Sequence, residues 1–440
     1  MTLANCHLVF AAAAESPNIV LIMADDLGYG DLGCYRSETN QTPHIDALAA
    51  SGLRFTDFHS SGPMCSPTRV ATLTGLYQQR FGSKFDGALS AKSEDPVNGL
   101  PLEAVTIAEL LKENGYVTGC FGKWHLGYRS PLLPPNQGFD EFRGLVSGDG
   151  DFHTQVDRLG RPDWWRGLEL QPDEGYTTDL LTDYSVDFIE RHQEKPFFLY
   201  VPHLAIHFPW QGPDDPPHRE VGQDYMRDKW GIIPDRANVQ PHVKAMIESL
   251  DQSVGRIVDA LKKLKLENNT IVVFTSDNGG YLNYAGGFEN ISSNGPLRGQ
   301  KVELYEGGHR VPMIVSWPGR ISAGVTDELT HSTDLFPTFA RLAGASTESI
   351  PLDGEDLSSL IFNGNPLPER MLFWRIRNNR AVRSGNWKLC AVKGKTELYD
   401  LQSDIGESND LAGKMPEKVQ AMTEAWEKWE EEVNRSAAGS

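Results

Sequence analysis

The stretch from Cys65 to Arg69 combines a sulfur nucleophile with a guanidinium group at the predicted start of a helix. Pro67 suits the first turn, because the N–H that it lacks would have no partner there, and the pattern predicts a helix over residues 67–76. Cys65 then lies just before the first turn, where free backbone N–H groups and the positive end of the dipole attract anions. Arg69 lies one turn further and can share a face with Cys65. The stretch is typical of a site for a negatively charged substrate, although a half-buried packing cysteine would give the same local pattern.

Oxygen-bearing side chains follow two predicted buried strands, at residues 18–24 and 270–275. Ligands of open α/β sheets bind outside the carboxyl ends of the strands, so two such strands side by side would gather these groups at one spot. Clustered carboxylates stay ionised only where a cation holds them, and oxygen donors favour Ca²⁺, with Mg²⁺ next. An aspartate after a strand can also simply cap the following turn. The predicted metal ligands are Asp25, Asp26, Asp277 and Asn278.

Three further stretches place titratable side chains after predicted strands or turns. Lys123 and His125 follow a buried strand with a spacing of two, so both point to one side if the extended conformation continues. Beside a metal this pair would act as an anion clamp, and elsewhere it would be a surface turn. His203 and His207 follow another strand and suit a two-histidine metal site or, better, an acid that serves a leaving group. Lys301 precedes a glycine-rich turn, and by itself that loop is uninformative.

Apolar runs that alternate with helical patterns must position these side chains. Such alternation predicts an α/β fold, in which helices sandwich a large, mostly parallel sheet. The predicted strands span residues 18–24, 53–56, 117–122, 197–201, 270–275 and 313–317. The predicted helices span residues 43–51, 67–76, 103–114, 177–192, 242–264 and 333–343.

The pattern changes near residue 345, where proline and glycine begin to punctuate short segments. Runs at 371–376, 380–392 and 396–401 predict hairpins of an antiparallel sheet, and residues 414–434 predict a charged amphipathic helix that packs on it. We therefore predict a catalytic α/β domain at 17–345 and a smaller C-terminal domain, an antiparallel sheet plus a helix, at 346–440.

Composition limits the classes of protein and of partner. The chain has 440 residues and a net charge of −19, which argues against nucleic acid as a partner. Five cysteines do not make a disulfide framework, and no apolar run reaches the roughly 18 residues that a membrane span needs. Residues 1–16 resemble the end of a secretory signal peptide without its charged first part, so we expect an exported protein, periplasmic or extracellular.

The residues from Cys65 to Arg69 match the C-x-P-x-R signature of type I sulfatases, in the alkaline-phosphatase-like superfamily. The resemblance extends through MADDLGYGD, TGLYQQRFG, GKWHLG, SDNGG and LYEGGHRVP, and covers the chain from about residue 17 onward. Within the family, the chain resembles the arylsulfatases and the N-acetylgalactosamine-6-sulfatases. The resemblance implies a sulfuric ester hydrolase with the alkaline-phosphatase-like fold.

The resemblance also implies how the site works. In this family a maturation enzyme oxidises the signature cysteine to Cα-formylglycine, whose hydrated gem-diol is the nucleophile. Cys65 would therefore be a precursor, and the modified residue would share Ca²⁺ with the four predicted oxygen ligands. The remaining roles implied are charge stabilisation by Arg69 and Lys123, a base at His125, a proton donor to the leaving oxygen at His207, and a sulfate contact at Lys301.

We expect a sulfated carbohydrate as substrate, because the insertion at 147–167 offers indole faces for sugar rings and basic groups, such as Arg158 and Arg161, for further anions. Alternatively, its tryptophans only pack the insertion onto the sheet. Glu303 departs from many relatives and would repel sulfate unless it accepts hydrogen bonds from sugar hydroxyls. An alternative function is hydrolysis of phosphonate or phosphate esters. The predicted substrate rim comprises His153, Trp164, Arg166, His203, Trp210 and Glu303.

Overall fold

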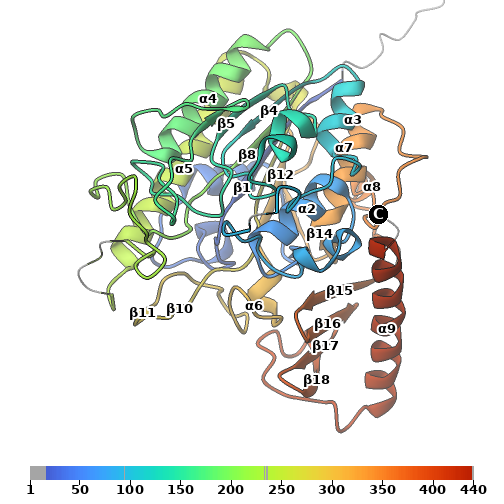
Figure 1. Ribbon diagram of the computed structural model, residues 1–440. Coiled ribbons are helices and arrows are strands. Elements are labelled where there is room, and N and C mark those ends of the chain that lie inside the picture. The colour runs from blue at the N-terminus through green and yellow to red at the C-terminus, as the bar shows by residue number, and fades with distance from the viewer. Residues whose placement is uncertain (1–15, 94, 232, 234–235, 439–440) are drawn as a thin grey trace, which may run out of the picture.

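The computed structural model describes residues 16–93, 95–231, 233 and 236–438 (Figure 1). A ten-stranded sheet forms the centre of the main domain, in the strand order β13-β2-β12-β9-β1-β8-β4-β5-β6-β7. The run β9-β1-β8-β4-β5 is parallel throughout, which confirms the predicted mostly parallel sheet. In contrast, β12 is antiparallel to both of its neighbours. The strands are β1 (Asn18–Ala24), β2 (Leu53–Phe55), β4 (Val117–Phe121), β5 (Glu141–Gly144), β6 (Trp165–Arg166), β7 (Glu169–Leu170), β8 (Phe197–Pro202), β9 (Thr270–Ser276), β12 (Met313–Ser316) and β13 (Gly324–Thr326).

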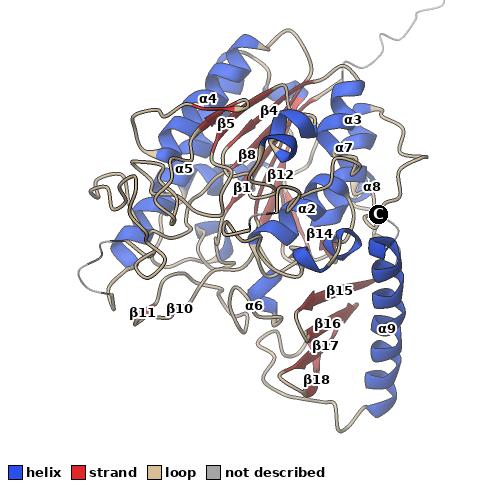
Figure 2. Cartoon of the chain, in the orientation of Figure 1, coloured by secondary structure: helices blue, strands red, loops and turns tan. Residues whose placement is uncertain are grey.

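Helices cover both faces of this sheet (Figure 2). Because successive side chains of a strand point to opposite faces, β1 contributes Ile19 and Leu21 to one core and Val20 and Ile22 to the other. The first core is closed by α2 (Cys65–Thr74), α3 (Ile107–Glu113), α7 (Leu335–Ala343) and α8 (Ser358–Asn363). The second core is closed by α1 (Pro43–Ser51), α4 (Thr177–Arg191) and α5 (Gln240–Lys263).

Local hydrogen bonding sets the helix ends. α2 begins two residues earlier than predicted, so Cys65 lies in its first turn. It ends at Thr74, and the following Gly75, with a φ of 69°, forms a left-handed C-cap. α3 begins at residue 107 because Thr106 and Glu109 form a capping box.

The C-terminal residues form a separate antiparallel sheet, which α9 (Pro416–Ala438) covers along its length (Figure 1). Trp426 and Trp429 of α9 pack against Val382 and Leu389 of the sheet, as the amphipathic pattern predicts. The main core extends past the predicted boundary at 345, since Leu357 and the α8 residues belong to it. The strands of the small sheet are β15 (Met371–Ile376), β16 (Asn379–Ser384), β17 (Trp387–Val392) and β18 (Lys395–Asp400).

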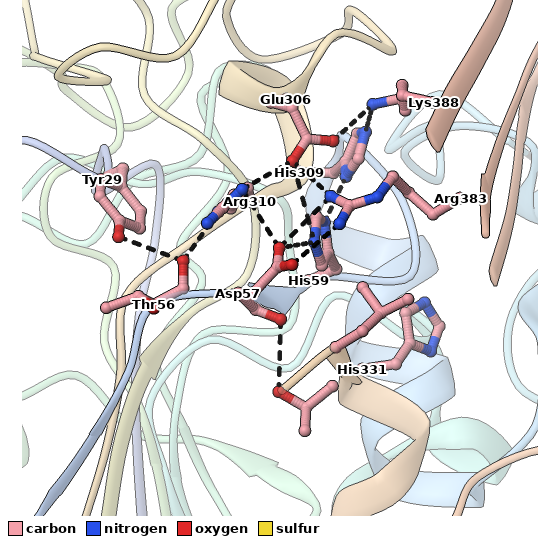
Figure 3. Close-up of polar contacts among 12 residues, drawn as sticks. Tyr29, Thr56, Asp57, His59, Glu306, His309, Arg310, His331, Arg383 and Lys388 are labelled. Carbon is pink, nitrogen blue, oxygen red and sulfur yellow. Dashed lines mark hydrogen bonds and ion pairs between the residues drawn. The ribbon is translucent and has the colours of Figure 1, made fainter. Parts of the chain in front are cut away.

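A buried network of charged and imidazole groups joins the two domains (Figure 3). Glu306, at the start of α6 (Glu306–His309), pairs with Lys388 of β17 at 2.7 Å and with Arg383 of β16 at 2.8 Å. Arg383 also pairs with Asp57 at 2.8 Å. We call this the interdomain network, and its members are Asp57, His59, Glu306, His309, Arg310, Arg383 and Lys388.

The remaining strands are short: β3 (Phe58–His59), β10 (Asn283–Tyr284), β11 (Phe288–Glu289) and β14 (Thr330–His331). The cysteines within the described residues are free thiols. No helix in the described part of the chain combines the length and apolar character that a bilayer crossing requires. The predicted signal-peptide remnant lies, apart from Ser16, outside the described residues.

Candidate active site

The two predicted acidic pairs lie side by side at the carboxyl edge of the sheet. β1 and β9 are parallel neighbours, with Ala24 opposite Ser276, so the residues that follow them emerge together. Asn278 donates from Nδ2 to Asp26 Oδ1 at 2.8 Å, and the Asp26 backbone N–H donates to Asp277 Oδ1 at 3.3 Å. Asp26 adopts a left-handed φ of 64°, which aspartate tolerates better than most residues.

Cys65 lies in the first turn of α2, next to the carboxylates at this edge of the sheet. Its Sγ is 3.4 Å from Asp25 Oδ1 and 3.3 Å from Lys301 Nζ, and the residue is 1% exposed. Burial, together with the Asp25 carboxylate, raises the pKa of the thiol to about 12. A thiol with this pKa is protonated at neutral pH and is therefore a poor nucleophile.

Three buried cations balance the carboxylates. Arg69 donates from Nε and Nη2 to Asp277 Oδ2 at 3.0 and 2.8 Å. Lys123 pairs with Asp25, and Lys301 pairs with Asp26 at 2.5 Å. Burial raises the pKa of the Asp25 and Asp277 carboxyl groups, while the neighbouring cations lower it in part.

Two buried oxygens at this site, Asp26 Oδ2 and Asn278 Oδ1, have no hydrogen-bond partner among the described residues. An unpartnered buried oxygen is costly, and a bound cation would remove that cost. Together with Asp25 and Asp277 they form a hard oxygen donor set of the kind that binds Ca²⁺ or Mg²⁺. Potential ligand atoms of Asp25, Asp26, Cys65 and His207 also lie within 4.8 Å of one another. The residues thus fit a divalent metal.

Two neutral imidazoles face the same edge. His125 Nε2 lies 3.2 Å from the Leu89 carbonyl, which can only accept, so Nδ1 carries the free lone pair. His207 Nδ1 lies 2.8 Å from the Phe208 carbonyl, which by the same reasoning leaves the lone pair on Nε2, 3.9 Å from Asp26 Oδ2. Burial, followed by the charge of Lys123, lowers the pKa of both histidines well below the usual value.

A cavity of about 320 Å³ opens above these groups and is lined by Cys65, His125, His207 and Lys301. The insertion reaches it through Gly148, Asp149, Arg158 and Leu159 and not through its tryptophans. Sequence reasoning missed several lining residues, of which Tyr128 and Tyr281 had a signal, because they directly follow the GKWHLG and SDNGG motifs. The missed residues include Tyr128, Asp149, Lys229, Tyr281 and Tyr284.

The structure does not bring the predicted substrate rim to this cavity. Trp164 and Trp210 are each 1% exposed and pack in the second core, where their large apolar rings are removed from water. His153 packs against Tyr176, 5.3 Å between ring centroids. Arg166 is exposed on β6, away from the cavity lining. Glu303 lines a neighbouring hollow of about 740 Å³, which shares Lys301, Tyr281 and Tyr284 with the cavity.

His203 is also absent from the rim. It is 0% exposed, its Nε2 lies 3.1 Å from Ser253 Oγ on α5, and burial lowers its pKa to about 3. Its side chain therefore belongs to the packing between the sheet and α5.

We expect His203→Gln to weaken the pH dependence of stability between pH 6.5 and 4. The unfolded chain binds a proton at this histidine below pH 6.5, whereas the folded chain does so only near pH 3, so wild-type stability falls as the pH drops. The slope of the free energy of unfolding against pH should decrease by up to about 1.4 kcal/mol per pH unit in the variant. Urea unfolding of both proteins at pH 7, 5.5 and 4.5 measures it, and parallel pH dependences would contradict the assignment.

Comparisons with known proteins agree with this geometry. The sulfatase family model matches residues 17–345, and a second model, N-sulphoglucosamine sulphohydrolase, C-terminal, matches residues 300–434. Human arylsulfatase A is 36% identical over 93% of this chain and 87% of its own length. Human N-acetylgalactosamine-6-sulfatase is 34% identical over 86% of this chain and 72% of its own.

Solved structures give the same result. The crystal structure of Ps i-CgsB in complex with k-i-k-neocarrahexaose has a TM-score of 0.84 and 33% identity, covering 96% of this chain and 94% of that one. PsFucS1 sulfatase from Pseudoalteromonas sp. has a TM-score of 0.77 and 26% identity, covering 97% and 92%. The resemblance inferred from the motifs is thereby confirmed, and the chain belongs to the sulfatase family of the alkaline-phosphatase-like superfamily, as a sulfuric ester hydrolase.

Proposed function

We propose that the protein releases sulfate from a sulfated carbohydrate, with Cys65 converted to formylglycine and Ca²⁺ held by Asp25, Asp26, Asp277 and Asn278. Support for the carbohydrate comes from the name of the N-acetylgalactosamine-6-sulfatase relative and from the neocarrahexaose complex of Ps i-CgsB. Oxygen donors and the two unpartnered oxygens support Ca²⁺. The apolar, small-residue composition of residues 1–16 supports export to the periplasm or the extracellular space.

The observation that carries the proposal is the position of Cys65, between Asp25 Oδ1 and Lys301 Nζ at the floor of the cavity. As a buried, protonated thiol it is a poor nucleophile, whereas formylglycine supplies an oxygen nucleophile at the same place. A bound Ca²⁺ would withdraw charge from the sulfuryl oxygens. Conversion of the cysteine requires a maturation enzyme in the host.

Side chains of the protein stabilise the negative charge and transfer the protons. Lys123 and Lys301 place two ammonium groups beside the nucleophile, where they stabilise the negative charge of the sulfuryl oxygens. His125 Nδ1, which has no hydrogen-bond partner among the described residues, accepts a proton from the nucleophile. His207 Nε2 becomes a donor once protonated, a state that a bound anionic ester favours, and delivers that proton to the leaving oxygen. Arg69 holds Asp277 in place through two hydrogen bonds.

The direct test measures sulfate released from sulfated oligosaccharides and from 4-nitrophenyl sulfate, beside phosphate released from an aryl phosphodiester. We expect kcat/KM to be larger for the sulfate esters. A preference for the phosphodiester would support the alternative hydrolase instead. The mass of the tryptic peptide that contains Cys65 should be lower by the difference between a thiol and an aldehyde.

Removal of the metal should abolish sulfate release, and Ca²⁺ should restore it more fully than Mg²⁺. Asp277→Asn should weaken Ca²⁺ binding, because it removes one carboxylate charge and breaks the ion pair with Arg69. Titration calorimetry of the apoprotein measures the affinity, and circular dichroism checks that the sheet is intact. Full activity after exhaustive dialysis against a chelator, with metal shown to be absent, would refute the role of the ion.

A further inference from the structure

We infer that Lys229 forms a second anion subsite in the active-site cavity and selects substrates whose sugar carries another anionic group besides the sulfate that is removed. The inference rests on the proposed function. It concerns a lysine that no step of the proposed mechanism uses and that no sequence motif marks.

Lys229 is held by aromatic rings, and its ammonium group pairs with no carboxylate among the described residues. Its ammonium nitrogen lies 5.3 Å from the centroid of Phe208, 5.2 Å from Tyr284 and 6.0 Å from Trp230. Aromatic faces stabilise a cation without neutralising it, so the charge stays available to an anion. Across the described parts of the chain, no carboxylate lies within ion-pair distance of this nitrogen, although the protein carries a net charge of −19.

Two other cations of the cavity differ in this respect, whereas Lys92, an exposed lysine of the lining, likewise has no carboxylate partner among the described residues. Lys301 pairs with Asp26, and the Arg158 Nε donates to Asp149 Oδ1 at 2.7 Å. Lys229 is half-buried and lines the same cavity. A positive charge that lines a cavity without a carboxylate partner among the described residues is complementary to a negatively charged ligand.

The position of Lys229 identifies which part of the substrate it meets. The ring of Phe208 lies 4.1 Å from the ring of His207, and the Arg158 guanidinium lies 5.4 Å from that same Phe208 ring. Because His207 serves the leaving oxygen, groups around Phe208 face the alcohol that leaves and not the sulfur. Lys229 would therefore contact an anionic substituent of the sugar.

The neighbouring surface suits a sugar ring. Tyr281 and Tyr284 line the cavity and pack edge to face, with centroids 4.7 Å apart. Flat aromatic faces beside a cation bind a pyranose and its charged substituent together. These tyrosines take the role that the sequence assigned to Trp164.

The test compares wild type with Lys229→Gln in two assays. One measures KM for 4-nitrophenyl sulfate, which carries a single anionic group. The other measures the Ki of a sulfated carrageenan hexaose as a competitor of that reaction. We expect the ratio of Ki to KM to rise at least about ten-fold in Lys229→Gln, the size of one lost charge pair, and to return toward wild type in Lys229→Arg. Lys195→Gln, which removes an exposed lysine at the opposite end of β8, should leave the ratio unchanged.

An unsulfated oligogalacturonate of similar length distinguishes the source of the anion, since it competes only if a carboxylate suffices. An unchanged ratio in Lys229→Gln, or a hexaose that does not inhibit wild type, would overturn the second subsite while leaving the sulfatase assignment intact. A wild-type protein that hydrolyses no sulfate ester would instead overturn the proposed function.

Discussion

Cys65→Ala is expected to lower kcat/KM for any sulfate ester by at least about 10³-fold, because in the proposed mechanism Cys65, which lines the cavity, is the precursor of the nucleophile. The folded state should lose less than about 2 kcal/mol, since the change deletes a single sulfur atom. Sulfate release and urea unfolding measure the two effects on the same preparation.

Two controls separate catalysis from packing. Cys65→Ser keeps the size of the side chain and should be equally inactive where the maturation enzyme oxidises only cysteine. A large loss of stability in Cys65→Ala with residual turnover would show that Cys65 is a packing residue and that another group attacks sulfur.

Glu306→Gln is expected to have the largest effect on stability, about 3–5 kcal/mol, because it leaves buried cations without their shared carboxylate. Glu306 accepts from Lys388 at 2.7 Å and from Arg383 at 2.8 Å, and these three groups are at most 1% exposed (Figure 3). Burial opposes ionisation, but Lys388 and Arg383 outweigh it and hold the pKa of Glu306 well below its usual range. Urea unfolding of wild type and variant measures the difference.

The sign of the pH effect follows from the lowered pKa. The ionised Glu306 stabilises the fold at every pH above its unfolded value near 4.5, and this contribution is lost as the pH falls toward the folded pKa. The difference in the free energy of unfolding between wild type and Glu306→Gln should therefore be constant from pH 6 to 8 and become smaller below pH 4.5. Asp183→Asn, which breaks the exposed pair with Arg256, is the matched control and should cost less than about 1 kcal/mol. Equal losses in the free energy of unfolding for the two variants would contradict the role of the interdomain network.

Glu306→Gln should also impair catalysis, because the interdomain network links two segments that carry active-site groups. Glu306 and His309 follow the loop that holds Lys301, and His59 precedes the turn that leads to Cys65. His59 Nδ1 and His309 Nδ1 lie 2.9 Å apart and connect the segments directly.

The sequence by itself determined six of the ten strands of the sheet, most of the helices that cover it and the edge at which its acidic residues meet. The reason is that these features depend on local periodicity and on one general property of parallel sheets. Apolar runs define β1 and β9, and side chains that follow parallel neighbours must meet at one edge, so the sequence alone places Asp25 and Asp277 together. Cys65 and Arg69 could likewise be placed on one helix face by their spacing.

Only the tertiary structure decided which groups surround that centre. Trp164 looks equally suited to a sugar surface or a core when read along the chain, and its burial depends on packing with Tyr184 of α4, which no local pattern encodes. Lys229 lies in a loop without periodicity, and its place beside Phe208 and Tyr284 depends on segments some 20 and 55 residues away in the chain. The interdomain network pairs Glu306 with Lys388 across two domains, and long-range packing alone brings such charges together.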